Sequence, residues 1–312
     1  MPHVGEVLVI GIDAGGTYTR LCARSNDGTP DLILNGDPAN ALRQGEARSA
    51  SVLAELIRGA LAQRQKYVLR AIHAGVAGAG SQGVQTNMAR RLRRRLQLDQ
   101  ECIVAVSHDG ITAIEGAFAG ESGLLFIAGT GSGVLARTMD GETGHAGGWG
   151  YVIGDEGSGQ ALGRRGLAAV AHAIDGGPVT ALSALLQERF GIADRDALLG
   201  AVFDRTWPIQ QVAPLVLHTA EAGDLVTAHI VHSEVMALAR QAEWLLKRVK
   251  NVDPRFAISG GLGKSKYYRK CLHHAVRAVW PESNMKRPQH SGLEGAVRLA
   301  VKQVVNGSDD FQ

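Results

Sequence analysis

A glycine-rich turn between two apolar segments occurs twice in the sequence, and this repeated design constrains the fold more than any other feature. Residues 124–137 read LLFIAGTGSGVLAR, in which Gly129–Gly133 separates two apolar runs. Residues 7–23 read VLVIGIDAGGTYTRLCA, in which Ala14–Thr17 separates a strand ending at Asp13 from an alternating return strand. Strand, turn and strand predict a β-hairpin in each segment. The matched pair indicates two related halves that face each other.

The residues of both turns suit an anion. Glycine lets backbone N–H groups approach an anion closely, and the hydroxyls of threonine and serine add further donors. We therefore expect the two loops to hold a nucleotide, and Asp13, beside the first loop, to hold Mg²⁺, usually through water. Two ordinary structural hairpins are the alternative. That alternative is the simpler interpretation of either loop alone, whereas the matched pair favours phosphate binding.

Two common nucleotide fingerprints are absent. Gly260-Gly261-Leu262-Gly263-Lys264-Ser265 contains GKS, but the Walker A spacing requires a glycine where Ile258 stands. The glycines of the second hairpin are one residue short of the dinucleotide motif GxGxxG. The nucleotide site predicted here is therefore of another kind.

Composition limits the class of protein. The 312 residues allow two domains of average size, and 45% hydrophobic residues suffice for their cores. Lys and Arg number 33 against 30 Asp and Glu, too small an excess to indicate a nucleic acid partner. Three scattered cysteines, Cys22, Cys102 and Cys271, favour buried free thiols in a reducing compartment. No signal-peptide pattern or membrane-length apolar run occurs, so we expect a soluble cytoplasmic protein that binds no membrane.

The order of elements predicts an α/β fold, rich in strands up to about residue 155 and rich in helices after it. Besides the two hairpins, apolar runs predict strands over 31–34, 67–76, 102–106 and 255–259. Helical periodicity predicts helices over 44–63, 81–97, 111–119, 159–173, 179–190, 196–203, 209–221, 224–249, 266–279 and 291–305. We expect an N-terminal domain over 1–115 and a C-terminal domain over 116–290, which would bind nucleotide and sugar. The last helix, in 291–312, is a candidate to return to the first domain.

Asp109 is the first candidate for a catalytic group. It follows the strand over 102–106 and precedes a helix, and this edge of an open α/β sheet is where ligands and catalytic groups collect. The alternative is that Asp109 only caps the helix. The helix after Ser81, its expected N-cap, carries five arginines between Arg90 and Arg95. No aromatic residues alternate with them, so a solvated helix face is favoured over a nucleic acid site.

The polar groups beside these turns form a set with a known chemical use. Phosphoryl transfer to an alcohol requires a cradle for the phosphates, a metal that offsets their charge, and a carboxylate that accepts the hydroxyl proton. The motifs GIDAGGTYTR, SHDG, FIAGTGSG, GGWGYVIGDEGSG and ISGGLGKS resemble, in this order, those of the BadF/BadG/BcrA/BcrD ATPase family. That family belongs to the sugar kinase, Hsp70 and actin superfamily. Within it the likeness is greatest to the N-acetylglucosamine kinases and the bacterial glucosamine kinases.

This resemblance implies a fold, a set of cofactors and roles for individual residues. The fold would consist of two ribonuclease-H-like α/β domains, as in actin-like ATPases, with ATP and Mg²⁺ in a central cleft. Asp109 matches the catalytic base, and Asp13 matches a position near the Mg²⁺. The matched ATP-binding positions are Gly15, Gly16 and Thr17 in the first loop, Gly129, Thr130, Gly131 and Ser132 in the second, and Gly260 and Gly261. The matched sugar-binding positions are Asn40, Gly78, Asp109, Gly148, Trp149 and Asp155.

Several of these residues have a structural alternative that the sequence leaves open. Trp149 offers an apolar face for a sugar ring, or it is a core residue. Asn40 contacts the sugar, or it caps the helix that follows. We expect Glu156 to be structural. Histidines such as His73 and His108 show no metal-ligand spacing, so ordinary satisfied or solvated histidines are expected.

Three functions compete. The first is ATP-dependent phosphorylation of the 6-hydroxyl of an amino sugar, with N-acetyl-D-glucosamine preferred narrowly over glucosamine. The second is an ATPase that activates a CoA-thioester dehydratase or reductase through an iron–sulfur cluster, which the positions of the three cysteines disfavour. The third is a sugar sensor without catalysis, which the retention of Asp13, Asp109 and both loops disfavours. A homodimer is implied by the resemblance alone.

Overall fold

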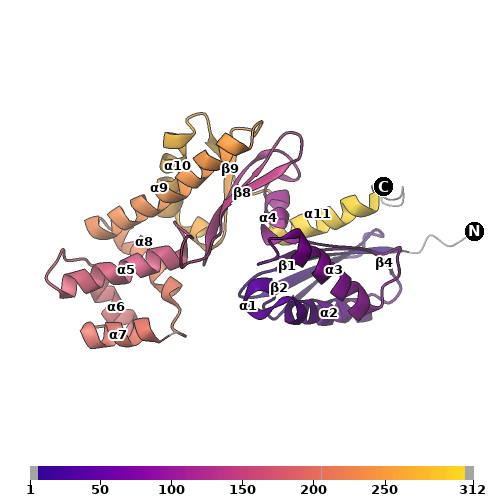
Figure 1. The fold of residues 1–312 in the computed structure, drawn as a ribbon, viewed down its shortest axis with the longest axis horizontal. Coiled ribbons are helices and arrows are strands. Elements are labelled where there is room, and N and C mark those ends of the chain that lie inside the picture. Colours follow the sequence, from indigo (N-terminus) through magenta and orange to yellow (C-terminus); the bar gives the residue numbers. More distant parts are fainter. Residues whose placement is uncertain (1–5, 205, 306–312) are drawn as a thin grey trace, which may run out of the picture. The chain divides into compact units, whose positions relative to one another are not determined.

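The computed structural model describes residues 6–204 and 206–305, and it divides the chain into two compact units (Figure 1). Unit 1 consists of Met1–Glu121 with Pro288–Gln312, and unit 2 consists of Ser122–Arg287. The boundary expected at residue 116 lies inside α4 (Asp109–Phe118), whereas the observed division follows the end of this helix. The reason is that α4 packs against α11 (Gly292–Val305), so the helix cannot be split between units.

Unit 1 is built on a mixed sheet of five strands. Its strands are β1 (Val7–Ala14), β2 (Thr19–Ser25), β3 (Leu32–Gly36), β4 (Val68–Val76) and β5 (Ile103–His108), in the spatial order β3-β2-β1-β4-β5. The first three strands pair antiparallel, whereas β4 and β5 run parallel to β1. The carboxyl ends of β1, β4 and β5 therefore meet at one edge of the sheet.

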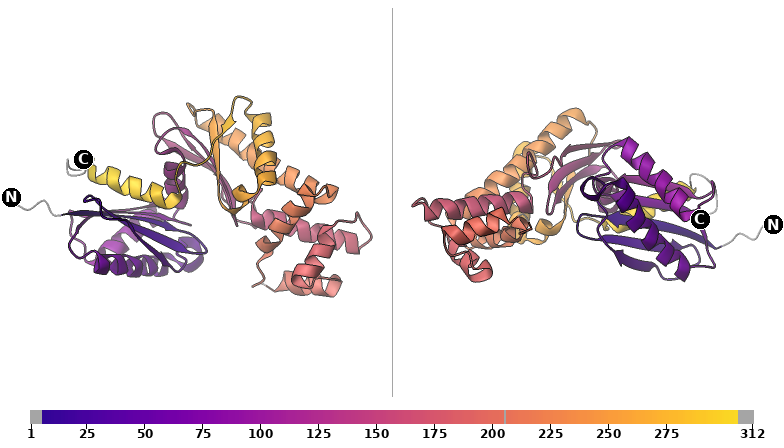
Figure 2. Two further views of the ribbon diagram at one scale, coloured as in Figure 1. Left: turned by 180° about the vertical axis from the view of Figure 1, so that it is seen from behind. Right: turned by 60° about the horizontal axis from the view of Figure 1, so that its bottom comes forward.

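Helices cover both faces of this sheet. Unit 1 contains α1 (Ala41–Gln44), α2 (Glu46–Gln63), α3 (Gln82–Leu96), α4 and α11. Figures 1 and 2 show α2 and α3 on one face and α11 on the other. Val9, Cys22 and Ala71 of the sheet pack with Leu293 and Val297 of α11 in a buried apolar cluster. The C-terminal helix is thus part of the core of unit 1.

Unit 2 repeats the sheet of unit 1. Its strands are β6 (Gly123–Ala128), β7 (Ser132–Arg137), β8 (Thr143–Gly147), β9 (Arg255–Ser259) and β10 (Asn284–Met285), in the order β10-β9-β6-β7-β8. β7 pairs antiparallel with both β6 and β8, whereas β9 and β10 run parallel to β6. Strand order and directions equal those of unit 1, so the predicted repetition of one design in the two halves and the α/β fold class are confirmed.

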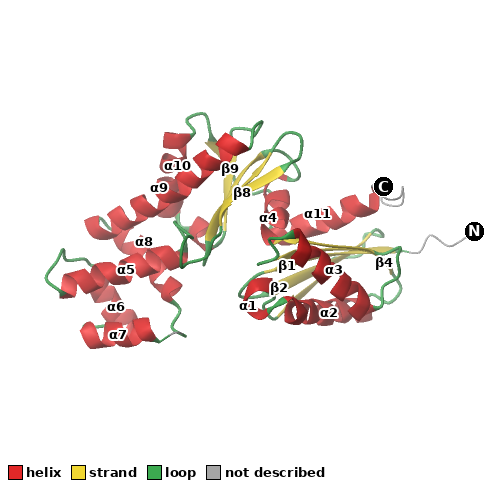
Figure 3. Ribbon diagram, viewed as in Figure 1, coloured by secondary structure: helices red, strands yellow, loops and turns green. Residues whose placement is uncertain are grey.

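Most of the helices of the structure lie in unit 2 (Figure 3). They are α5 (Gly159–Ile174), α6 (Leu182–Phe190), α7 (Arg195–Phe203), α8 (Ala213–Glu221), α9 (Leu225–Arg248) and α10 (Lys266–Val279), with two short 3₁₀ helices, η1 (Ile209–Val212) and η2 (Gly261–Lys264). Helix α9 packs on β7 and β8, and α10 packs on α9. The apolar stripe of α9, predicted from the sequence, lies in the buried core, to which it contributes Leu238 and Leu245.

The three cysteines are free and buried, as predicted. They lie in β2, before β5 and in α10. Burial raises the pKa of Cys22 to about 12 and that of Cys102 to about 11, so both thiols stay protonated at neutral pH. Among the residues that the structure describes, no helix is long and apolar enough to cross a membrane.

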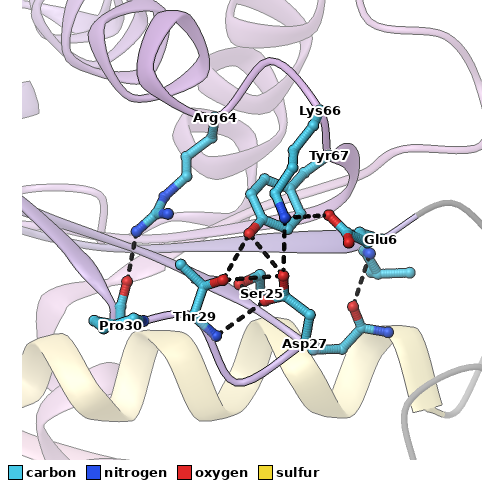
Figure 4. A network of polar contacts seen from close by, with 10 residues as sticks. Glu6, Ser25, Asp27, Thr29, Pro30, Arg64, Lys66 and Tyr67 are labelled. Atoms are coloured by element: carbon cyan, nitrogen blue, oxygen red, sulfur yellow. Dashed lines mark hydrogen bonds and ion pairs between the residues drawn. The ribbon is translucent and has the colours of Figure 1, made fainter.

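A polar network fastens the turn between β2 and β3 to the start of β4 (Figure 4). The carboxylate of Asp27 accepts hydrogen bonds from the Ser25 hydroxyl at 2.7 Å, the Thr29 backbone N–H at 3.0 Å and the Tyr67 hydroxyl at 2.9 Å. Lys66 Nζ lies 3.1 Å from the same carboxylate. These bonds hold the pKa of Asp27 far below its usual range, with the Ser25 bond as the largest cause.

Candidate active site

Two carboxylates lie at the carboxyl edge of the unit 1 sheet. Asp13 stands at the end of β1, and Asp109 follows β5 directly as the first residue of α4. Burial raises the pKa of the Asp13 carboxyl, and the negative charge of Asp109 raises it further, whereas Arg20 lowers it. Arg20 Nη2 lies 3.5 Å from Asp13 Oδ2. The topology thus brings together two acidic side chains that the sequence predicted separately.

Asp109 is not the cap of α4, so that alternative is wrong. The N-cap is His108, whose Nδ1 accepts a hydrogen bond from the Gly110 backbone N–H at 3.1 Å. The other ring nitrogen, Nε2, lies 3.2 Å from Asp109 Oδ1. Histidine therefore takes over the capping, and the Asp109 carboxylate is not used for it. The side chain of Asp109 is 31% exposed.

The first glycine-rich loop is tied to its surroundings through backbone bonds. Gly15 donates its N–H to the Tyr18 carbonyl at 3.0 Å, and its own carbonyl accepts from Ala39 N–H at 3.2 Å. A methyl group added at Gly16 would lie 3.8 Å from Asn40 Nδ2 and 3.9 Å from Arg43 Nη1. Nitrogen donors, one of them charged, therefore stand beside this loop, which suits an anion. Arg43 was not among the residues predicted from the sequence.

Asn40 caps α1, as the structural alternative required. Its Oδ1 accepts hydrogen bonds from the backbone N–H groups of Leu42 and Arg43, both at 3.0 Å. Gly78 has φ +79°, and a Cβ there would lie 2.7 Å from Leu42 N and 2.8 Å from Asn40 Oδ1. Glycine at 78 is what allows the start of α1 to approach the end of β4. Asn40 and Gly78, two of the three predicted sugar-binding residues of unit 1, are therefore neighbours.

The second loop is fixed by the start of α5. The carbonyls of Gly129 and Thr130 accept hydrogen bonds from Gly159 N–H at 2.8 Å and Gln160 N–H at 3.2 Å. Ser132, which is buried, donates its hydroxyl to the Glu156 carbonyl at 2.7 Å. The hydroxyl proton of Ser132 is therefore already donated within the protein. Thr130, which is exposed, carries the hydroxyl that a ligand can reach.

Gly260 and Asp155 lie against the second loop. Gly260 has φ +101°, and an added Cβ would lie 2.4 Å from the Ala128 carbonyl oxygen and 3.0 Å from Gly129 N. A Cβ at Gly131 would lie 2.8 Å from Asp155 Oδ2. Asp155 is 8% exposed and has φ +62°, a conformation that costs energy in a residue other than glycine. Unit 2 thus gathers these predicted residues around one turn.

Trp149 is an exposed residue, so the core alternative is wrong. Its side chain is 74% exposed. It lies in a turn with Gly148 and Gly150, both with positive φ, and Asp155 Oδ1 accepts from Gly150 N–H at 3.3 Å. An exposed indole held beside a nearly buried carboxylate is suited to contact a ring that carries hydroxyl groups.

Buried polar residues beneath the turn at Glu156 and Gly157 were missed by the sequence analysis. Gln241 Nε2 donates to Glu156 Oε2 at 2.6 Å, which agrees with the structural role expected for Glu156. Glu234 accepts from Gly157 N–H at 2.7 Å, and the Tyr268 hydroxyl donates to the Gly157 carbonyl at 2.6 Å. Glu234 and Gln241 stand two helical turns apart within the apolar stripe of α9. Two polar residues at helical spacing within an apolar stripe could have indicated, from the sequence, that they bond to a buried backbone segment.

The surroundings of Asp13 fit a divalent cation. Its carboxyl is partly buried and close to a second carboxylate, and such crowding of negative charge is relieved by a cation. Within the described residues, no three His, Cys, Asp or Glu side chains gather to hold a metal. Mg²⁺ commonly takes one or two protein carboxylates and completes its shell with water and phosphate oxygens. The residues present therefore suit Mg²⁺ bound together with a nucleotide.

Known proteins resemble this chain over most of its length. The N-acetyl-D-glucosamine kinase of Dictyostelium discoideum is 27% identical over 323 residues, which cover 96% of this chain and 99% of the relative. The N-acetylmuramic acid/N-acetylglucosamine kinase of Clostridium acetobutylicum is 28% identical over 229 residues, which cover 72% of this chain and 74% of that protein.

A solved structure gives the same result. The crystal structure of a provisionally assigned N-acetylglucosamine kinase from Chromobacterium violaceum matches with a TM-score of 0.76 at 28% identity, covering 95% of this chain and 99% of that one. The model of the BadF/BadG/BcrA/BcrD ATPase family matches residues 10–300. The chain therefore belongs to the BadF/BadG/BcrA/BcrD ATPase family.

Proposed function

We propose that this protein transfers the γ-phosphoryl group of ATP to the 6-hydroxyl of an amino sugar, with N-acetyl-D-glucosamine as the preferred acceptor. The observation that carries the proposal is the Asp109 carboxylate, which stands at the end of β5 while His108 performs the capping. A carboxylate in this position is suited to act as a general base. The relatives named as N-acetylglucosamine kinases support the choice of reaction and sugar.

In the proposed mechanism, Asp109 accepts the proton of the sugar 6-hydroxyl as the oxygen attacks the γ-phosphorus, the bond from that phosphorus to the bridging oxygen breaks, and ADP leaves. Because the transferred phosphoryl group carries dispersed negative charge, positioning and electrostatic stabilisation supply most of the catalysis. In unit 1, Gly15, Gly16 and Thr17 would contact the phosphates. Arg43, whose guanidinium stands near Gly16, adds positive charge at that loop.

In unit 2, Gly129, Thr130, Gly131 and Ser132 would form the second phosphate loop, with Gly260 and Gly261 at the adenosine. The backbone of this loop is already fixed by α5 and by Gly260, so little ordering is required when the nucleotide binds. Asp13 would hold Mg²⁺, directly or through water. When bound, the metal offsets the negative charge of the phosphates.

In unit 1 the proposed sugar contacts are Asn40, Gly78 and Asp109. In unit 2 they are Gly148, Trp149 and Asp155. The Oδ1 atom of Asn40 is used in capping α1, so its amide Nδ2 is the group offered to a sugar oxygen. The carboxylate of Asp155 accepts hydrogen bonds from sugar hydroxyls, and the indole of Trp149 packs on the ring.

The test is a coupled assay of ADP release with Mg²⁺-ATP and a panel of sugars: N-acetylglucosamine, glucosamine, N-acetylmuramic acid, N-acetylmannosamine and glucose. We expect N-acetylglucosamine to give the highest kcat/KM. The Asp109→Asn variant should lose at least about 100-fold in kcat, because general-base catalysis typically contributes that much. Phosphorus and carbon NMR of the product should show the phosphate on the 6-oxygen.

Each outcome decides among the alternatives. Preference for glucosamine would assign the other amino sugar. ADP release that does not depend on sugar, with an iron–sulfur cluster after anaerobic purification, would favour the dehydratase activator. Sugar binding without ADP release would favour the sensor. Turnover of Asp109→Asn within about tenfold of the wild type would reject Asp109 as the base. The homodimer and the cytoplasmic location stay predictions, which light scattering and cell fractionation test.

A further inference from the structure

A buried histidine of unit 1 has no part in the proposed reaction. His73 lies on β4 and is 6% exposed. Its Nδ1 lies 3.1 Å from Gln303 Nε2 on α11, and its Nε2 lies 3.0 Å from Ser107 Oγ on β5. Ser107 in turn donates its hydroxyl to the His108 carbonyl at 3.2 Å. Gln303, His73, Ser107 and His108 therefore form a continuous chain of hydrogen bonds from the last helix to the residue before Asp109.

The direction of this chain is fixed at both ends. With the amide nitrogen of Gln303 facing His73, as the structure places it, Nδ1 is the acceptor and a neutral ring carries its proton on Nε2. At the other end, Ser107 spends its single proton on the His108 carbonyl, so Ser107 Oγ accepts from His73 Nε2. Both ends demand the same tautomer of His73.

His73 stays neutral under ordinary conditions. Burial lowers its pKa to about 4, although the nearby negative charge of Glu115 acts in the opposite direction. A neutral ring can donate at one nitrogen and accept at the other, whereas a protonated ring donates at both and would lose the bond from Gln303. The chain is therefore complete at neutral pH.

The chain ends on the backbone that carries Asp109. The His108 carbonyl belongs to the peptide group that joins His108 to Asp109, so the Ser107 bond fixes the plane of that peptide. The next peptide is held as well, because Thr112 Oγ1 donates to the Asp109 carbonyl at 2.8 Å. The two peptide groups that flank Asp109 are thus both anchored, and they fix the direction in which its side chain leaves the backbone.

We propose that Gln303, His73 and Ser107 form a positioning relay, through which α11 holds the proposed base in its productive orientation. The inference deepens the proposed function and rests on it, since it gives Asp109 the role of general base. The three residues touch neither substrate, and they act only through the backbone of Asp109. The relay also explains why a polar chain crosses the otherwise apolar packing between α11 and the sheet.

The test compares two serine-to-alanine substitutions in unit 1. Ser107→Ala removes the hydroxyl of the relay. Ser49→Ala removes a hydroxyl of α2 that is also buried but has no hydrogen-bond partner within the described part of the chain. We expect Ser107→Ala to lower kcat by roughly 10-fold to 100-fold with KM for both substrates within about twofold, because a misplaced base reduces the chemical step. Ser107→Thr, which restores a hydroxyl, should recover most of the loss.

The control and a second measurement keep the relay separate from simple stability. Ser49→Ala should leave kcat unchanged. A kcat of Ser107→Ala within about twofold of the wild type, or an equal loss in Ser49→Ala, would overturn the relay. Nitrogen-15 spectra of ring-labelled histidine at neutral pH should show His73 as the Nε2–H tautomer, and Gln303→Leu should alter that signal. An Nδ1–H tautomer of His73 would also overturn the relay. If the wild type phosphorylates no sugar, both the proposed function and the catalytic role of the relay are rejected. The histidine spectra still decide whether the hydrogen-bonded chain itself exists.

Discussion

At Gly260 the backbone and one neighbouring carbonyl leave no space for a side chain. Its φ is +101°, and an added Cβ would lie 2.4 Å from the Ala128 carbonyl oxygen. We expect Gly260→Ala to lower the free energy of unfolding by about 2 kcal/mol or more, since strained backbone and steric overlap add. Urea unfolding followed by circular dichroism measures this.

The adjacent residue supplies the matched control for that substitution. A Cβ at Gly261 meets nothing within 4 Å. Gly261→Ala should therefore change the free energy of unfolding by no more than about 0.5 kcal/mol. Equal losses in the two variants would show that the geometry around Gly260 is not the cause.

Single residues also mark what the sequence could and could not predict. The capping of α3 by Ser81 followed from residue type and position and is confirmed, since its hydroxyl accepts from Val84 N–H at 3.3 Å. The capping of α4 by His108 did not follow, because histidine is an unusual N-cap beside an aspartate that fits the same role. Likewise, the sequence could not reveal that the Ser132 hydroxyl is used by Glu156, a contact between residues 24 positions apart.

At the scale of elements, the network around Asp27 in Figure 4 joins the turn between β2 and β3 to β4. Because the folded protein holds the pKa of Asp27 below its value in the unfolded chain, the ionised carboxylate stabilises the fold above about pH 4. This stabilisation is lost as the pH falls below that value. Asp27→Asn should therefore be less stable than the wild type at pH 7, and the difference should shrink towards pH 2.

Thermal melts between pH 7 and pH 2 measure that difference. Tyr67→Phe removes one donor to Asp27 and should give a smaller loss at pH 7, with part of the same pH dependence. A constant gap between Asp27→Asn and the wild type across the whole range would contradict the account, because the loss would then not depend on ionisation.

The same scale shows which elements the sequence could predict. Long periodic segments such as α9, and both hairpins, were found because hydrophobic pattern alone determines them. The strands β8 and β10 were missed. β10 has two residues and exists only through its pairing with β9. β8 contains Gly144, where a Cβ would lie 2.6 Å from Val249 Cγ2, so packing by the end of α9 sets its composition instead of strand propensity.

For the whole molecule, the two units differ in how the chain builds them. Unit 2 is continuous, whereas unit 1 needs α11 to cover one face of its sheet. An ion pair also joins α11 to α4: Lys302 Nζ lies 2.7 Å from the carboxylate of Glu115, whose side chain is 1% exposed. A chain ending at Arg287 would leave that acidic group buried without this partner and the apolar cluster uncovered.

We therefore expect a fragment of residues 122–287 to unfold cooperatively in a thermal melt, and a chain truncated after Arg287 to lose the transition of unit 1. Burial of Val297 and Ala300, both without exposed surface, is the main reason. Joining residues 288–312 to the end of residues 1–121 through a flexible linker is the control, and it should restore the transition. A cooperative transition of unit 1 without α11 would contradict this account of its core.

The discontinuity of unit 1 also sets an order of events during synthesis. Domains usually fold as they leave the ribosome, beginning at the N-terminus. Here β1, which carries Asp13, and β5, which directly precedes Asp109, emerge early, but α11, which covers their sheet, emerges after both units' strands. Unit 2 can therefore complete its fold before unit 1, although its synthesis begins later. Until α11 has been made, the first unit presents an open apolar sheet face, which is the kind of surface that chaperones bind.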